Sequence, residues 1–144
     1  FGSAVAIDRG MIIVGAPDFD GADPFSSEGA AYGFVLDGAL YVETFKLQPE
    51  GFTSGFGQQI AMFAERIVVR ATTGISTDCD GWQESAFSYT RAGSSVLPRG
   101  IASWAGRGGG LALADQRLLV GIPCDYFGAP DPGHANFYRL NVFE

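Results

Sequence analysis

Residues 1–7 (FGSAVAI) and 11–17 (MIIVGAP) form the pattern that decides the fold of this chain. The pattern returns without a gap at residues 56–62 (FGQQIAM) and 66–72 (RIVVRAT), and a third, weaker copy occupies residues 107–123. The three copies start 55 and then 51 residues apart. Self-similarity at such a period indicates a repeat architecture, and a period of roughly 40–50 residues is typical of propeller blades.

Each copy predicts short antiparallel strands joined by tight turns. In the first copy, residues 2–7 are small and apolar, which suits a strand buried on both faces. Residues 11–14 are rich in β-branched side chains, and the proline that follows cannot continue a central strand. No helix is expected. The expected strands are 2–7, 11–14, 30–36, 39–47, 57–63, 67–71, 85–90, a weak one near 95–97, 109–114, 118–122 and 135–140.

The repeat therefore predicts an all-β chain of about three four-stranded antiparallel blades. The first blade would cover residues 1–55, the second 56–106 and a truncated third 107–144, together one partial propeller domain. A β-sandwich and a β-solenoid are the alternatives, but a sandwich does not require this repeat and solenoid coils are shorter. Propellers close with roughly four to eight blades. The expected partners are therefore further blades, of the same or another chain.

The Phe-Gly pair that heads a copy and the Gly-Ala-Pro that ends its second strand resemble the FG-GAP repeat, the blade unit of the integrin α-chain propeller. Copy one carries Phe1-Gly2 and Gly15-Ala16-Pro17, whereas copy two keeps Phe56-Gly57 but has Arg70-Ala71-Thr72. Copy three retains Gly121-Ile122-Pro123. The resemblance implies an incomplete propeller that belongs to an extracellular or cell-surface protein.

The motif has a physical meaning in such a propeller. Inner strands converge on the axis, where space is scarce, so small residues such as Ala4, Ala6 and Ala61 fit there. Phe1 and Phe56 are expected to insert between neighbouring blades.

Composition limits the classes of partner. The chain has 144 residues, 47% of them hydrophobic, and a net charge of −7 with nine Lys and Arg residues in no cluster. Nucleic-acid binding requires a basic stripe, so this function is not expected. The sequence contains no apolar run close to the roughly 18 residues of a membrane helix, so membrane insertion is not expected either.

The resemblance raises the possibility of calcium, because integrin blades often carry an acidic loop before the second strand. Here that place holds short turns, such as Asp8-Arg9-Gly10, with too few oxygen ligands for Ca²⁺. The better candidates for a hard cation are Asp18, Asp20 and Asp23, in the loop after Gly-Ala-Pro. The alternative is a solvated acidic loop with local Asx-turns.

The two cysteines lie in corresponding loops of neighbouring copies. Adjacent blades would bring Cys79 and Cys124 to one face, and the extracellular resemblance implies a disulfide between them. The alternative is two separate thiols, or links to other chains.

Four aromatic residues fall in the loops after the second strands, namely Phe19, Trp82, Tyr126 and Phe127. Displayed beside acidic residues on one propeller face, they would suit recognition of a protein or a glycan. The alternative is that they fold down and pack between blades.

No catalytic residue is expected. His134 is the only histidine, it falls where a strand begins, and no Gly-x-Ser-x-Gly elbow is present. The sequence thus favours a non-catalytic structural, adhesion or assembly module. The alternative is a glycan- or Ca²⁺-binding recognition module on the loop face, and a hydrolase is the least favoured class.

Overall fold

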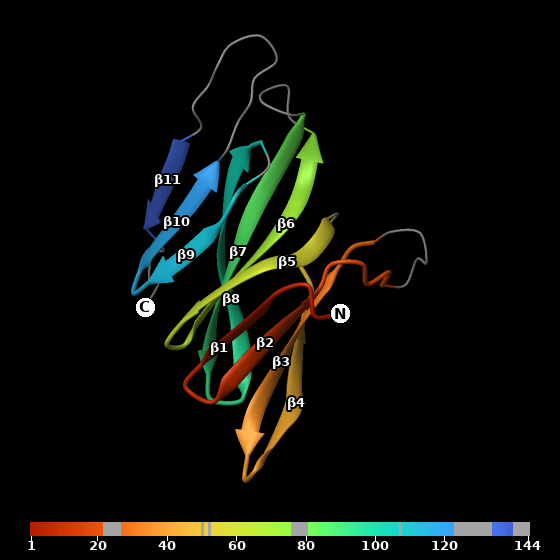
Figure 1. Ribbon diagram of the computed structural model, residues 1–144, viewed down its shortest axis with the longest axis vertical. Coiled ribbons are helices and arrows are strands. Elements are labelled where there is room, and N and C mark those ends of the chain that lie inside the picture. The colour runs from red at the N-terminus through yellow and green to blue at the C-terminus, as the bar shows by residue number, and fades with distance from the viewer. Residues whose placement is uncertain are drawn as a thin grey trace.

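The eleven strands of the described residues form three antiparallel sheets, and these residues contain no helix (Figure 1). The structure is a computed structural model that describes residues 1–21, 27–49, 51, 53–75, 81–106, 108–122 and 134–139. The all-β prediction, with antiparallel four-stranded units, is confirmed for these residues. Two sheets have four strands, and the third has three among the described residues.

Each sheet draws its strands from consecutive residues. Sheet 1 contains β1 (Val5–Asp8), β2 (Met11–Ala16), β3 (Ala30–Asp37) and β4 (Leu40–Leu47). Sheet 2 contains β5 (Ser54–Phe63), β6 (Arg66–Ile75), β7 (Trp82–Ala92) and β8 (Ser95–Ala105). Sheet 3 contains β9 (Leu111–Ala114), β10 (Arg117–Ile122) and β11 (His134–Arg139). In every sheet the strands follow one another as a simple meander.

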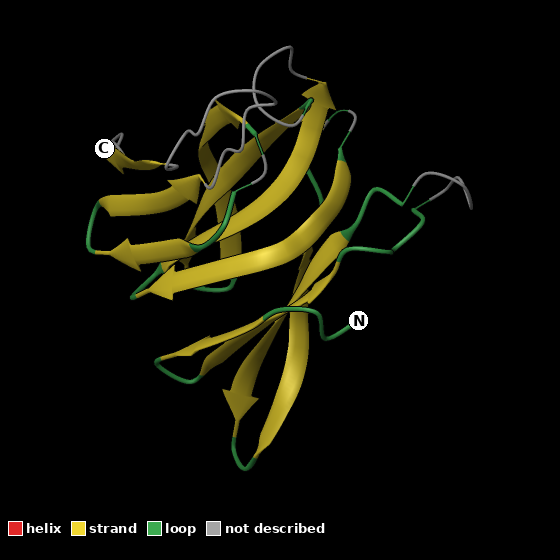
Figure 2. Cartoon of the chain, turned by 45° about the horizontal axis from the view of Figure 1, so that its top comes forward, coloured by secondary structure: helices red, strands yellow, loops and turns green. Residues whose placement is uncertain are grey.

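The three sheets meet at their first strands. The middle sheet's β5 contacts β1 on one side and β9 on the other (Figures 1 and 2). Away from these strands a groove opens between β4 and β8, so sheets 1 and 2 diverge toward their fourth strands. Sheets 1 and 2 are thus closer together at their first strands than at their fourth strands.

The two faces of each sheet have different neighbours. We call the face that contacts the next sheet along the chain the forward face, and the opposite one the rear face. The forward face of sheet 1 carries Met11, Ile13, Ala31 and Leu47, and these cluster with the rear face of sheet 2, which carries Phe56, Ile67, Val69, Ala71, Phe87 and Tyr89.

The contact between sheets 2 and 3 uses the same pair of faces. The forward face of sheet 2 carries Val68, Ala86 and Trp104, and the rear face of sheet 3 carries Leu118, Val120 and Ile122. In the repeat, Val68 stands at the position of Ile13, and Leu118 at that of Ile12 and Ile67. Both contacts are therefore one heterologous interface used twice, with sheet 2 covered on both faces.

The two phenylalanines of the Phe-Gly motif differ in burial. Phe56 is fully buried between sheets 1 and 2, which confirms the insertion predicted for it. Phe1 occupies the same position on sheet 1 but is 75% exposed, so the prediction that it lies between two sheets is wrong for the described residues. The reason is that no described sheet lies behind sheet 1.

Because no described sheet lies behind sheet 1, the burial predicted for the first strand is also wrong. Val5 and Ile7 point from β1 to the rear face of sheet 1 and are 61% and 65% exposed. The strand is therefore not buried on both faces.

The weak strand expected near residues 95–97 is longer than predicted, because β8 runs through Pro98 and Gly100 for eleven residues. A bulge between Ser88 and Tyr89 adjusts its register with β7.

Glycine at the motif position permits the close approach of sheets 1 and 2. Gly57 has a φ of 99°, and a Cβ added there would lie 2.5 Å from the carbonyl oxygen of Ala30. A Cβ added at Gly15 would in turn overlap the carbonyl oxygen of Gly57. Larger residues at either position would force the sheets apart.

Substitution of Gly57 tests this packing. Gly57→Ala is expected to lower the free energy of unfolding by about 2–3 kcal/mol, from left-handed strain together with overpacking. Gly2→Ala is the matched control, because Gly2 is the same motif residue with a φ of 86° and open space around it. Its cost is expected to stay near 1 kcal/mol. Urea unfolding measures both, and equal losses would contradict the close approach.

Candidate functional site

The most distinctive polar site lies where sheet 3 meets sheet 2. Arg70 occupies the repeat position that is glycine in the other two copies, at Gly15 and Gly121. Its Nε lies 3.6 Å from Oε2 of Glu84, and the two side chains are only 10% and 3% exposed. Arg70 on β6 and Glu84 on β7 therefore form a buried ion pair on the forward face of sheet 2.

Hydrogen bonds connect this pair to the beginning of the third copy. The Nη1 of Arg70 donates to the carbonyl oxygen of Gly108, and the backbone N–H of Gly108 donates to Oε2 of Glu84 at 2.5 Å. The Nη2 of Arg70 donates to Oε1 of Gln58 at 3.1 Å. Burial lowers the pKa of Arg70 from its ordinary value, and the charge of Glu84 opposes this shift. The ion pair thus links Gly108 to sheet 2. At the equivalent repeat positions, sheets 1 and 2 are in contact through Gly57 and Gly15.

A pocket of about 330 Å³ opens beside the ion pair. We call it the Trp82 pocket, and its lining is Ser54, Gln58, Arg70, Thr72, Trp82, Glu84 and Gly108. Trp82 is the first residue of β7, is 40% exposed and contributes the aromatic part of the lining. Hydroxyl, amide and charged groups beside an aromatic face are suited to a polyhydroxylated ligand such as a sugar.

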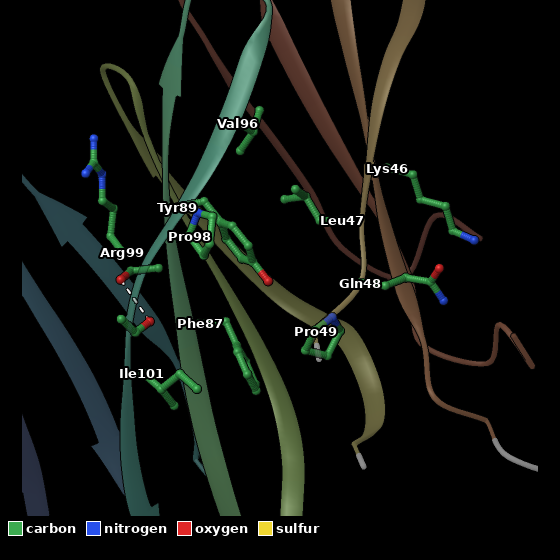
Figure 3. A pocket seen from close by; sticks show the side chains of 12 residues that line it. Lys46, Leu47, Gln48, Pro49, Phe87, Tyr89, Val96, Pro98, Arg99 and Ile101 are labelled. Atoms are coloured by element: carbon green, nitrogen blue, oxygen red, sulfur yellow. Dashed lines mark hydrogen bonds between the residues drawn. The ribbon is translucent and has the colours of Figure 1, made fainter. Parts of the chain in front are cut away.

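A second, larger hollow is the apolar groove of about 590 Å³ between sheets 1 and 2 (Figure 3). Figure 3 shows Leu47 and Pro49 on one side, Val96 and Pro98 on the other, and Tyr89 between them. The ammonium group of Lys46 turns away from this groove and lies 3.5 Å from the ring centroid of Phe19. Few polar groups converge inside the groove, so its walls offer little to orient a ligand.

The position of Tyr89 in this groove changes the pKa of its hydroxyl group. The side chain is 7% exposed, and burial raises the pKa of Tyr89 from 10.0 to about 12. In the unfolded chain a tyrosine titrates near pH 10, so ionisation favours unfolding between pH 10 and about 12. The stability linked to the neutral hydroxyl is fully present below pH 10 and is lost as the pH rises toward 12.

An alkaline titration of stability tests this burial. We expect unfolding free energy to fall by about 1.4 kcal/mol per pH unit above pH 10, or roughly 2–3 kcal/mol in total, because of Tyr89. Tyr89→Phe is expected to remove this part of the decline, measured by urea midpoints across the pH series. If the unfolding free energy of Tyr89→Phe fell equally steeply with pH, ionisation of a buried Tyr89 would not be the cause of the decline.

The predicted cation ligands are only partly described. Asp18 and Asp20 are exposed, whereas Asp23 lies outside the described residues. Over the residues that the structure covers, no three His, Cys, Asp or Glu side chains are grouped to hold a metal ion. The pairs β1–β2, β5–β6 and β9–β10 are each joined by a turn of two residues, at the places where integrin blades often carry calcium loops. Cation binding by the acidic loop remains a prediction.

The remaining predicted residues are distributed differently. Phe19 is half-buried and its ring lies 6.5 Å from that of Tyr32 on the rear face of sheet 1. The cysteine pair Cys79 and Cys124 lies outside the described residues, as do Tyr126 and Phe127. His134 begins β11, as its place in the repeat predicted. Of the aromatic residues proposed for recognition, Trp82 is thus the one found beside a pocket among the described residues.

Sequence reasoning missed Arg70 and Glu84. Arg70 was visible only as a departure from Gly-Ala-Pro, which signals a weakened motif. A different interpretation was available, because a charged residue at a buried repeat position requires a partner. That requirement would have pointed to a carboxylate on the neighbouring strand.

No described element is a helix long and apolar enough to cross a membrane. Neither the search against protein-family models nor the search of curated proteins gave a match for this sequence. The likeness to FG-GAP repeats therefore rests on the motif residues of the chain itself.

Proposed function

We propose that this chain is a non-catalytic, extracellular segment of an FG-GAP-type β-propeller. It acts as a structural, adhesion or assembly module of a larger surface protein or filament. The observation that carries the proposal is the repeated interface, in which the forward face of one sheet contacts the rear face of the next.

Repetition of one heterologous interface favours a propeller over a sandwich. A β-sandwich pairs two inner faces once and leaves both outer faces to solvent. Here each face of sheet 2 contributes residues to an apolar cluster shared with a neighbouring sheet, and both faces are covered. Heterologous contacts generate rings or open filaments when they continue, and the meeting of first strands supports a ring.

The interaction surfaces of such a module are the two faces that no described sheet covers. The rear face of sheet 1 exposes Phe1, Val5 and Ile7, and the forward face of sheet 3 exposes Phe137 at 77%. Exposed apolar faces of this kind are typical of interaction sites. The extracellular location is inferred from the FG-GAP resemblance alone.

Oxidative footprinting of the native assembly tests this function. Hydroxyl radicals label exposed aromatic rings, so in the isolated chain Phe1 should be labelled strongly and the half-buried Tyr32 and Phe34 more weakly. In the assembly purified from its source, the same rings should be protected several-fold, because a partner covers the rear face of sheet 1. Equal labelling in both samples would contradict an assembly function, whatever the partner is.

The Trp82 pocket favours a second candidate function, recognition of a glycan on the loop face. The supporting observation is an exposed indole beside the buried pair Arg70 and Glu84. A glycan array probed with the wild-type chain and with Trp82→Ala tests it. Binding that disappears in Trp82→Ala supports recognition, whereas no bound glycan, or equal binding by both proteins, contradicts it.

A further inference from the structure

We propose that the rear face of sheet 1 binds the forward face of sheet 3 from a second copy of this chain. The inference rests on the proposed assembly function and names its partner. It follows from the interface that the chain already uses twice within itself.

The rear face of sheet 1 carries the same arrangement of aromatic rings as the rear face of sheet 2, which sheet 1 covers. Phe1 lies 5.4 Å from the ring of Tyr32 and 6.5 Å from that of Phe34. In sheet 2, Phe56 lies 5.6 Å from the ring of Phe87 and 6.4 Å from that of Tyr89, at the same repeat positions. The aromatic group of sheet 2 is buried by a forward face, so the matching group of sheet 1 has the shape to receive one.

The β-branched positions beside these rings also correspond. Ile12 and Val14 stand on the rear face of sheet 1 where Ile67 and Val69 stand on that of sheet 2. Ile67 and Val69 are fully buried, whereas Ile12 and Val14 are half-buried. The two rear faces therefore correspond in their apolar residues, and among the described residues only that of sheet 2 is covered by another sheet.

The forward face of sheet 3 supplies an apolar surface. Ala112, Leu119 and Phe137 form one row across β9, β10 and β11. The equivalent row of sheet 1 is Ala6, Ile13 and Gly33, and that of sheet 2 is Ala61, Val68 and Ser88, all on forward faces. Phe137 is 77% exposed on this row, so its ring is free to pack on the aromatic group of another rear face.

The contact is heterologous, because it joins two different surfaces. In two copies related by a twofold axis, each forward face can meet the other's rear face, and this closes a ring. The three described sheets of each copy would together make six, which lies within the range of roughly four to eight blades that close propellers. If the rotation per sheet does not close the ring, the same contact gives a filament.

Sedimentation of one-sided variants tests the proposal. The rear variant combines Phe1→Ser with Ile7→Glu, and the forward variant is Phe137→Glu. All three side chains are at least 65% exposed, so the fold should persist, as circular dichroism and urea unfolding will verify. Ile75→Glu is the matched control, because Ile75 is 85% exposed at the end of β6 and lies on neither open face.

We expect the wild-type chain and Ile75→Glu to associate, and each one-sided variant to stay monomeric. An equimolar mixture of the two variants should form a one-to-one complex, since each retains the surface that the other lost. Association of Phe137→Glu with itself would overturn the head-to-tail contact.

A wild-type chain that stays monomeric at its highest soluble concentration would overturn the second-copy proposal. If footprinting still showed protection of Phe1 and Tyr32 in the native assembly, the assembly function would stand and the partner would be another polypeptide segment. Failure of both measurements would remove the assembly function as well.

Discussion

Replacing Phe56 by alanine is expected to lower the free energy of unfolding by about 3–5 kcal/mol. The ring is fully buried among residues of sheets 1 and 2 and packs edge-on against Phe87. Its removal deletes apolar contacts to both sheets and leaves a cavity that the two sheets cannot easily fill. Since domains of this size are stable by only about 5–15 kcal/mol, the loss would be a large part of the total.

Phe1→Ala is the matched control for this prediction. Phe1 has the same sequence motif and packs on two aromatic residues at the equivalent repeat positions, but it is 75% exposed. Its replacement is expected to cost less than about 1 kcal/mol in the monomeric chain. Urea unfolding at a concentration where the chain is monomeric measures both. Equal losses at the two positions would mean that the motif phenylalanine is not buried by a neighbouring sheet.

Replacing Glu84 by alanine is expected to cost about 3–5 kcal/mol, because it leaves the buried guanidinium of Arg70 without its counter-charge. The backbone N–H of Gly108 also loses its acceptor. The Arg70 guanidinium and the Gly108 N–H connect sheet 3 to sheet 2. We therefore expect the amide hydrogens of β10 to exchange faster in the variant, in addition to the fall in global stability. Urea unfolding and hydrogen exchange by mass spectrometry give the two readouts.

Two comparisons sharpen the test on Glu84. Glu65→Ala removes an exposed carboxylate from the β5–β6 turn and is expected to stay within about 0.5 kcal/mol of wild type. The double variant Arg70→Met/Glu84→Leu removes both charges and should recover much of the loss, since apolar replacement of a buried pair is often neutral. A Glu84→Ala effect no larger than that of Glu65→Ala would contradict a buried ion pair.

Local sequence patterns predicted most strands because the turn chemistry and the β-branched runs coincide in each copy. The pattern around Met11 and Ile13 is an example, since the same spacing returns at Arg66 and Val68. The length of β8 could not be predicted in the same way. Pro98 and Gly100 disfavour a strand locally, and pairing with β7 across a bulge is a tertiary effect.

Burial and the polar site depended on neighbours that no single copy specifies. Val5 and Ile7 look like core residues in sequence, yet their exposure is decided by whether a sheet lies behind sheet 1. The pairing of Arg70 with Glu84 joins two strands and the start of the next copy. Such contacts emerge only when the copies are stacked in space.

Methyl-labelled NMR spectroscopy tests the repeated interface most directly. Ile12 and Ile13 are adjacent on β2 and point to opposite faces of sheet 1, and only Ile13 belongs to the cluster shared with sheet 2. We predict nuclear Overhauser cross-peaks from the Ile13 methyl groups to side chains of sheet 2, and from the Ile12 methyl groups only to sheet 1 in the monomeric chain. Cross-peaks from Ile12 to sheet 2, with none from Ile13, would contradict the forward-to-rear stacking.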